Sequence, residues 1–195
     1  MKVKNLALCV ALISAIPPLA LAQDVLMGDR RLACEAILCL ASGSRPNECT
    51  PSIRRYFSIS YRKISDTIKG RADFLRLCPA ANTDPTMARF VNDLAAGAGR
   101  CDAASLNLTT MSLASSGEGA ATYVSDAMPD FCTAYTSNPY TDLSATKPVY
   151  VGLPQRGGRW VEAVDYPAAL ADYQARIATE DAAREDSRRT SDGGQ

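Results

Sequence analysis

The sequence contains no histidine, one tryptophan and no excess of charge of either sign. Without histidine, the chain has no Ser-His-Asp or Cys-His nucleophilic site, no histidine metal ligand and no imidazole acid–base catalyst. With 21 basic and 21 acidic residues, electrostatics gives no reason to expect direct contact with nucleic acid or with an anionic membrane. The cysteine spacing also lacks the paired C-x₂₋₄-C knuckles typical of zinc sites. We therefore expect no metal and no other cofactor.

Long apolar runs are missing except at the N-terminus, where residues 1–22 have the pattern of a secretory signal peptide. Lys2 and Lys4 form a short basic region, Leu6–Ile16 is apolar, and Ala20–Ala22 supplies an A-x-A cleavage pattern. The apolar run is shorter than the roughly 20 residues that a helix needs to cross a bilayer. We expect residues 1–22 to be removed on export, leaving a protein without an integral membrane span.

Cysteine, by contrast, is plentiful. Cys9 leaves with the signal peptide, and an even number then remains in an exported chain, which predicts three disulfides. Six cysteines allow 15 pairings, and the sequence alone does not select one. The six are Cys34, Cys39, Cys49, Cys78, Cys101 and Cys132.

Helix geometry narrows the choice. Cys34 and Cys39 are five residues apart in a predicted helix, which places them about 7.5 Å apart along the axis and about 140° apart around it. That separation exceeds the roughly 7 Å between Cα atoms that a bridge tolerates, so each must reach a different partner. This argues for structural bridges and against a dithiol redox switch. The preferred pairing is Cys39–Cys49 around a loop, Cys34–Cys78 across the next helical region, and Cys101–Cys132.

The first half of the mature chain has apolar residues at helical spacing. Asp29 is expected to cap the first helix, and Thr50-Pro51 and Asp84-Pro85 are each typical of a helix start. The expected helices cover 30–41, 50–77 (as one helix, or as two with a break near 58–60) and 85–97.

The second half gives weaker signals. Residues 102–121 are rich in Ala, Ser, Thr and Gly and predict a loop with one short helix, and 121–134 predicts another helix. Segments 147–153 and 160–164 alternate in polarity around a Gly-Gly turn and predict a β-hairpin. Pro167 is expected to open an Ala-rich helix.

The predicted fold class is therefore mainly α, a disulfide-stapled helical domain with a small C-terminal β-hairpin. We expect one such domain over residues 23–180. The charged and polar residues 181–195 predict a disordered tail.

Two polar motifs raise the possibility of catalysis. Ser60 and Lys63 match S-x-x-K, the nucleophile motif of penicillin-binding proteins, but the companion motifs S-D-N and K-T-G are absent. Glu35 invites comparison with a glycosidase acid, but no second carboxylate is placed beside it by the sequence. We expect no catalytic residue, and a peptidoglycan-modifying enzyme that uses Glu35 or Ser60 remains the alternative.

Aromatic residues are the other surface candidates. Trp160, beside the predicted Gly-Gly turn, is either an exposed binding anchor or a cover for the core beneath the hairpin. The tyrosines considered with it are Tyr56, Tyr135, Tyr140 and Tyr150.

Several segments together carry a family resemblance. "LACEAILCLASGSRPNEC", with its C-x₄-C-x₉-C spacing, is followed by "PSIRRYFSI", "FLRLCP", "YTDLSATKPVYVG" and "RGGRWVEA". The region from Asp29 to Ala163 resembles the TrbM/KikA/MpfK family of conjugal transfer proteins. The resemblance implies a periplasmic protein of the mating-pair-formation apparatus, a type IV secretion system, with protein subunits of that apparatus as partners and no catalytic motif. A saposin-like, lipid-interacting helical protein is a third alternative, because disulfide-stapled helices also suit that role.

Overall fold

The computed structural model describes residues 26–116 and 119–192, so the predicted signal peptide lies outside the described residues. The prediction of a mainly helical, three-disulfide fold with a small C-terminal strand pair is confirmed. The helices and strands are α1 (Gly28–Ala41), α2 (Thr50–Ser58), α3 (Ile64–Leu75), α4 (Pro85–Gly97), α5 (Ala103–Thr109), β1 (Met111–Ser116), β2 (Gly119–Val124), α6 (Asp130–Thr136), β3 (Pro148–Val151), β4 (Arg159–Glu162) and α7 (Tyr166–Asp192), with short 3₁₀ turns between several of them.

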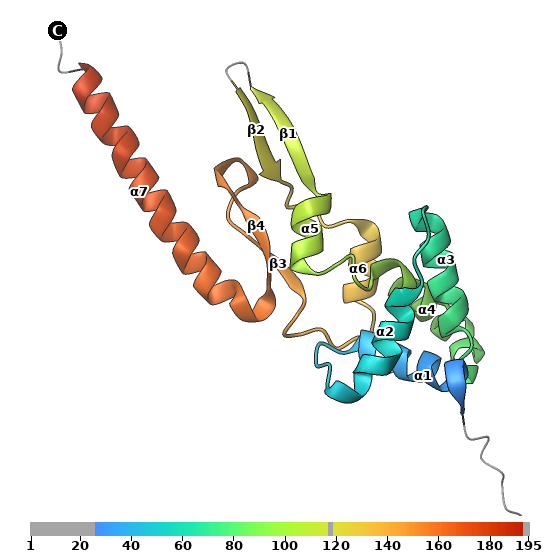
Figure 1. Ribbon diagram of the computed structural model, residues 1–195. Helices are drawn as coiled ribbons and strands as arrows, with labels where there is room; N and C mark the ends of the chain where they lie inside the picture. Colours follow the sequence, from blue (N-terminus) through green and yellow to red (C-terminus); the bar gives the residue numbers. More distant parts are fainter. Residues whose placement is uncertain (1–25, 117–118, 193–195) are drawn as a thin grey trace, which may run out of the picture.

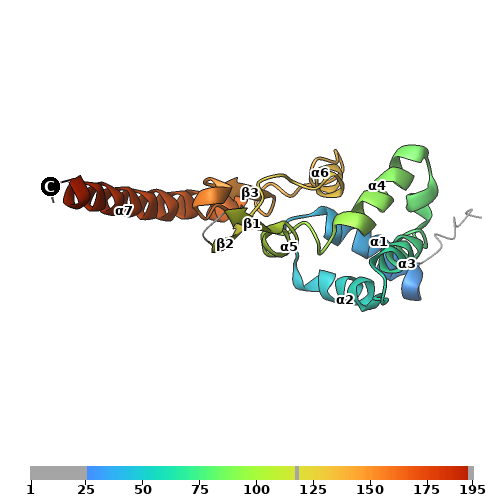
Figure 2. The same ribbon diagram turned by 90° about the horizontal axis from the view of Figure 1, so that it is seen from above.

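Helices α1 to α4 and α6 form a helical body at one end of the molecule, and α7 projects from the other end (Figures 1 and 2). The main core lies in the body, and its largest fully buried side chains include Leu40, Tyr56, Leu75 and Leu94. Burial of these apolar surfaces is the main driving force for this packing. No helix among residues 26–116 and 119–192 is long and apolar enough to cross a membrane.

Local sequence signals explain most of the helix boundaries. Asp84 caps α4 as expected, because its side chain accepts hydrogen bonds from the backbone N–H groups of Thr86 and Met87. The region after Thr50 forms two helices, separated by residues 59–63. The cap assigned to Asp29 is wrong: α1 begins at Gly28, two residues before the expected start, and the Asp29 carboxylate pairs with Arg55 on α2 at 2.7 Å.

Three disulfides tie these helices together, and they join the same pairs that the sequence favours. Cys39–Cys49 closes the loop between α1 and α2, Cys34–Cys78 joins α1 to the turn after α3, and Cys101–Cys132 joins the start of α5 to α6. Cα separations of 4.9 to 5.7 Å are ordinary for such bridges. The body is thus cross-linked along most of its length.

The prediction for residues 102–134 is wrong in part. A short helix, α5, is present, but β1 and β2 then form an antiparallel hairpin, in register from Met111–Val124 to Ser116–Gly119. The helix expected over 121–134 is shortened to α6 because residues 119–124 pair as a strand. Pro129, which has no backbone N–H to donate, stands immediately before the helix.

The C-terminal hairpin of β3 and β4 is present as predicted, with antiparallel register from Pro148–Glu162 to Val151–Arg159. Helix α7 packs on it through a second, smaller group of buried residues, Val151, Val161 and Ala169. The disordered tail predicted from residue 181 is corrected, since α7 continues to Asp192, while residues 193–195 lie outside the described chain.

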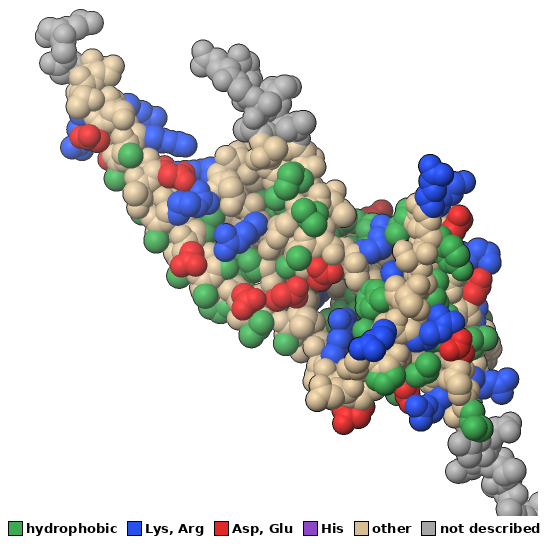
Figure 3. Space-filling view, viewed as in Figure 1, with side chains coloured by type: hydrophobic (Ala, Val, Ile, Leu, Met, Phe, Trp, Pro, Cys, Tyr) green, Lys and Arg blue, Asp and Glu red, His purple; other side chains and the backbone are tan. Residues whose placement is uncertain are grey.

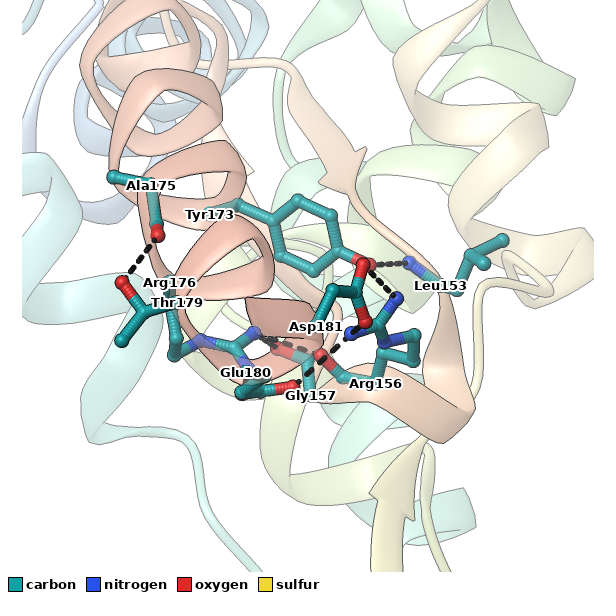
Figure 4. Close-up of polar contacts among 9 residues, drawn as sticks. All are labelled: Leu153, Arg156, Gly157, Tyr173, Ala175, Arg176, Thr179, Glu180 and Asp181. Carbon is teal, nitrogen blue, oxygen red and sulfur yellow. Dashed lines mark hydrogen bonds and ion pairs between the residues drawn. The ribbon is translucent and has the colours of Figure 1, made fainter. Parts of the chain in front are cut away.

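Polar contacts explain why the helix extends this far (Figure 4). The guanidinium of Arg156, in the turn between β3 and β4, pairs with Asp181 at 2.5 Å and Glu180 at 3.4 Å. Arg176 donates to the backbone oxygen of Arg156 at 2.7 Å, and the Tyr173 hydroxyl accepts a hydrogen bond from the Leu153 N–H at 3.0 Å. These contacts hold α7 as far as Asp181, and Ala, Arg and Glu beyond it are good helix formers.

Candidate binding cleft

A cleft of about 400 Å³ lies where the helical body meets the C-terminal hairpin. Figure 3 shows a hollow between the two halves, with acidic side chains gathered on the C-terminal side and basic ones on the helical side. The residues that define the cleft come from five distant segments: Arg45, Asp102, Tyr135, Leu143, Thr146 and Glu162.

One wall is the loop that follows α1. Gly43 donates its N–H to the Asp142 carbonyl oxygen and Asp142 donates its N–H to the Ala41 carbonyl oxygen, both at 2.7 Å. A side chain at Gly43 would place its Cβ 2.9 Å from the Thr146 hydroxyl, so a larger residue here would have to displace Thr146. The fixed loop presents Arg45, which is exposed and forms no ion pair with any described carboxylate.

The opposite wall is formed by Glu162 at the end of β4. Its Oε1 accepts a hydrogen bond from the Ala103 N–H at 2.9 Å, whereas its Oε2 is buried and accepts none from the described residues. Burial raises the pKa of Glu162, and the carboxylates of Asp102 and Asp165 raise it further. The Ala103 N–H and the positive charge of Arg45 act in the opposite direction.

The remaining polar groups of the cleft are already engaged. Asp102 caps α5, because one carboxylate oxygen accepts from the Ser105 N–H and the other from the Ser105 hydroxyl, each at 2.8 Å. The Tyr135 hydroxyl donates to the Leu40 carbonyl oxygen at 2.6 Å, and its ring lies against Gly97. The Arg45 guanidinium therefore interacts with the Tyr135 hydroxyl but forms no ion pair with a described carboxylate, and one oxygen of Glu162 has no donor among the described residues.

Most of the aromatic candidates prove to be structural. Trp160 is only 5% exposed, donates its indole N–H to the Ser125 carbonyl oxygen and meets Tyr150 edge to face, so it covers the core and is not an exposed anchor. Tyr56 and Tyr135 are buried, and burial raises the pKa of Tyr150 to about 12. Tyr140 is the exposed member of the set, at 50%.

The catalytic candidates lie apart from the cleft. Glu35 is on α1 and pairs with Arg31, one helical turn away, at 3.3 Å. Ser60 and Lys63 both lie in the exposed link between α2 and α3, not together on one helix. The S-x-x-K motif depends on placing both side chains on one helix turn, and this arrangement does not provide it.

Metal binding has no evident site in the part of the chain that the structure describes. There, no group of three or more cysteine, aspartate or glutamate side chains is placed to hold an ion. The six cysteines of the predicted mature chain are all in disulfides and do not offer thiolates.

Sequence reasoning missed both Arg45 and Glu162. Each lies in a segment quoted for the family resemblance, "SGSRP" and "RWVEA", but the segments meet only in the folded chain. A single charged residue in a loop or at a strand end carries no signal of its own. The sequence could have pointed to Arg45 and Glu162 only through the two segments that carry the family resemblance.

Comparison with known proteins gives one result. The sequence model of a family described as TrbM matches residues 25–174, well over half of the chain. No curated protein and no solved structure is significantly similar. The protein belongs to the TrbM family, and membership of this family implies involvement in conjugal transfer.

Proposed function

We propose that the protein is a non-enzymatic periplasmic component of the mating-pair-formation apparatus, the type IV secretion machinery of conjugation. The observation that carries the proposal is the TrbM family match over residues 25–174, in a chain with three disulfides. Disulfides of this kind persist in oxidising compartments such as the periplasm. The signal-peptide pattern of residues 1–22 is in keeping with that location.

The arrangement of polar side chains supports a role in binding. The candidate nucleophile Ser60 lies in the link between α2 and α3, where no helix turn places Lys63 beside it, and Glu35 is paired with Arg31 outside the cleft. The three bridges and the packed core make the helical body a rigid support. A rigid body that carries a cleft and a projecting helix suits a part that holds other proteins in position.

A transfer assay tests this role. A plasmid that lacks the gene is complemented with the wild-type chain, with Glu35→Gln or with Ser60→Ala, and plasmid transfer between cells is counted. We expect the deletion to reduce transfer and both variants to restore it, with the protein recovered in the periplasmic fraction and shortened by the signal peptide. Loss of transfer in either variant, at normal periplasmic abundance, would favour a peptidoglycan-modifying enzyme and contradict the proposal.

Lipid binding is the other alternative and has its own test. The mature, oxidised protein is sedimented with neutral and with anionic phospholipid vesicles. We expect it to remain in the supernatant with both. Sedimentation with either vesicle would support the saposin-like alternative and count against the proposed role.

A further inference from the structure

Glu162 and Arg45 carry opposite charges on the lining of the same cleft, and neither forms an ion pair with a described residue. Burying a carboxylate oxygen without a hydrogen bond costs free energy, and an ammonium or guanidinium donor relieves that cost. The Oε2 atom of Glu162 is in this situation, because the described residues donate to Oε1 alone. Oε2 is closed to solvent in this side-chain conformation, so a cationic group that enters the cleft reaches it through a rotation of the Glu162 carboxylate and then gains a charge-assisted hydrogen bond.

Arg45 adds the complementary requirement. Its loop is held by backbone hydrogen bonds to Asp142 and by the Cys39–Cys49 bridge, so the backbone that carries the Arg45 side chain is fixed in position. A purely cationic ligand would meet Arg45, and a purely anionic one would meet Glu162 and Asp102. The pair of walls therefore favours a ligand with a positive and a negative group side by side.

The volume of the cleft and its apolar lining limit the size and the chemical class of such a ligand. About 400 Å³ lies within the range of small ligand sites and has room for two side chains, but not for a helix. Leu143, Pro148 and the Cys101 end of a disulfide supply apolar surface beside the charged groups. Long charged side chains such as lysine, arginine and glutamate bury their methylene stems on apolar surface while their heads pair with charges.

We propose that this cleft binds an extended peptide segment of a partner protein in which a basic and an acidic residue are adjacent. The basic side chain pairs with Glu162, and the acidic side chain pairs with Arg45. The identification of the ligand as a protein segment rests on the proposed role in the transfer apparatus. The charge pattern of the ligand rests on the cleft alone.

The test uses purified, oxidised mature protein and the synthetic peptide acetyl-Ala-Lys-Glu-Ala-amide, with binding followed by NMR shifts of backbone amides. We expect the peptide to shift the backbone amides of residues 42–45 and 159–163. Glu162→Gln and Arg45→Met should each weaken binding at least tenfold, while Glu48→Gln and Arg54→Met, exposed charges near the same loop, should change it less than twofold. Glu162→Gln keeps the acceptor for the Ala103 N–H, so the cleft should remain folded.

Peptides with one charge removed complete the test. Acetyl-Ala-Lys-Gln-Ala-amide and acetyl-Ala-Met-Glu-Ala-amide should each bind at least fivefold more weakly. Four results would overturn the inference. They are equal binding of all three peptides, equal binding of free lysine or glutamate, no amide shifts at about 10 mM peptide, and tighter binding by the Arg45→Met variant. The last result would mean that Arg45 closes on Glu162 and competes with the ligand.

The two proposals fail in different ways. If the deletion leaves transfer unchanged while the peptide binds as described, the proposed function is wrong and the charge specificity of the cleft stands. If the protein is needed for transfer but the peptide does not bind, the inference about the cleft is wrong and the proposed function stands.

Discussion

The two disulfides of α1 should differ in how much they stabilise the protein. The perturbations are the paired substitutions Cys34→Ala with Cys78→Ala, and Cys39→Ala with Cys49→Ala. Cys34–Cys78 closes a loop of 44 residues and Cys39–Cys49 one of 10. On the loop-entropy estimate, at 25 °C these bridges contribute about 4 and about 2.7 kcal/mol, a difference of about 1.3 kcal/mol.

Packing should not reverse this order. Cys39 and Cys49 are both buried, at 9% and 7% exposure, whereas Cys78 is buried at 4% and Cys34 is only partly buried. The Cys39–Cys49 variant therefore loses more side-chain contacts, so the measured difference should be smaller than the loop-entropy estimate but keep its sign. The assay is urea unfolding of the oxidised proteins, followed by circular dichroism and extrapolated to water. The reasoning would be refuted if removing the Cys39–Cys49 bridge lowered the free energy of unfolding as much as, or more than, removing the Cys34–Cys78 bridge.

Three further changes test other parts of the structure. Gly97→Ala would push its methyl group into the ring of Tyr135, and urea unfolding should show a loss of about 1–3 kcal/mol; an unchanged midpoint would contradict that packing. Arg156→Met removes the pair with Asp181, so hydrogen exchange should speed up in the last turns of α7 while overall stability falls by about 1 kcal/mol or less; unchanged exchange would contradict it. Because burial raises the pKa of Glu162, ionisation of this residue opposes folding, and the free energy of unfolding falls as the pH rises through that pKa. Glu162→Gln should therefore stabilise the protein at pH 7 and lose this advantage below about pH 4. A variant that is less stable than the wild type at pH 7 would contradict the direction of this effect.

The helical half of the fold could be predicted because its signals are local. Asp84 followed by proline marks a helix start by its own chemistry, and the spacing of Cys34 and Cys39 on one helix is enough to exclude their pairing. The second half carries no such signals. The β1–β2 hairpin consists largely of small residues without a strong apolar alternation, so its pairing is not visible in the sequence.

Long-range contacts account for the remaining differences. The end of α7 looks like a disordered tail by composition, and its helix is held by Arg156 from the hairpin turn. The position of Asp29 in the sequence is typical of a helix N-cap, but its carboxylate forms an ion pair with Arg55 on the next helix. The cleft likewise depends on the meeting of distant segments, which no local pattern reveals. Of the candidate residues, the sequence favoured the three cysteine pairs that the structure contains, and it missed Arg45 and Glu162.

The most direct test of the proposed role is crosslinking inside living cells that carry the conjugative plasmid. A photo-crosslinking amino acid replaces Ser44, an exposed residue beside the cleft, and Glu185, on the projecting part of α7, serves as the comparison position. The captured proteins are identified by mass spectrometry. We predict capture of a subunit of the mating-pair-formation apparatus from Ser44, reduced when Glu162→Gln is added. Recovery of no apparatus subunit from either position, while subunits known to be neighbours crosslink in the same cells, would contradict the proposed function.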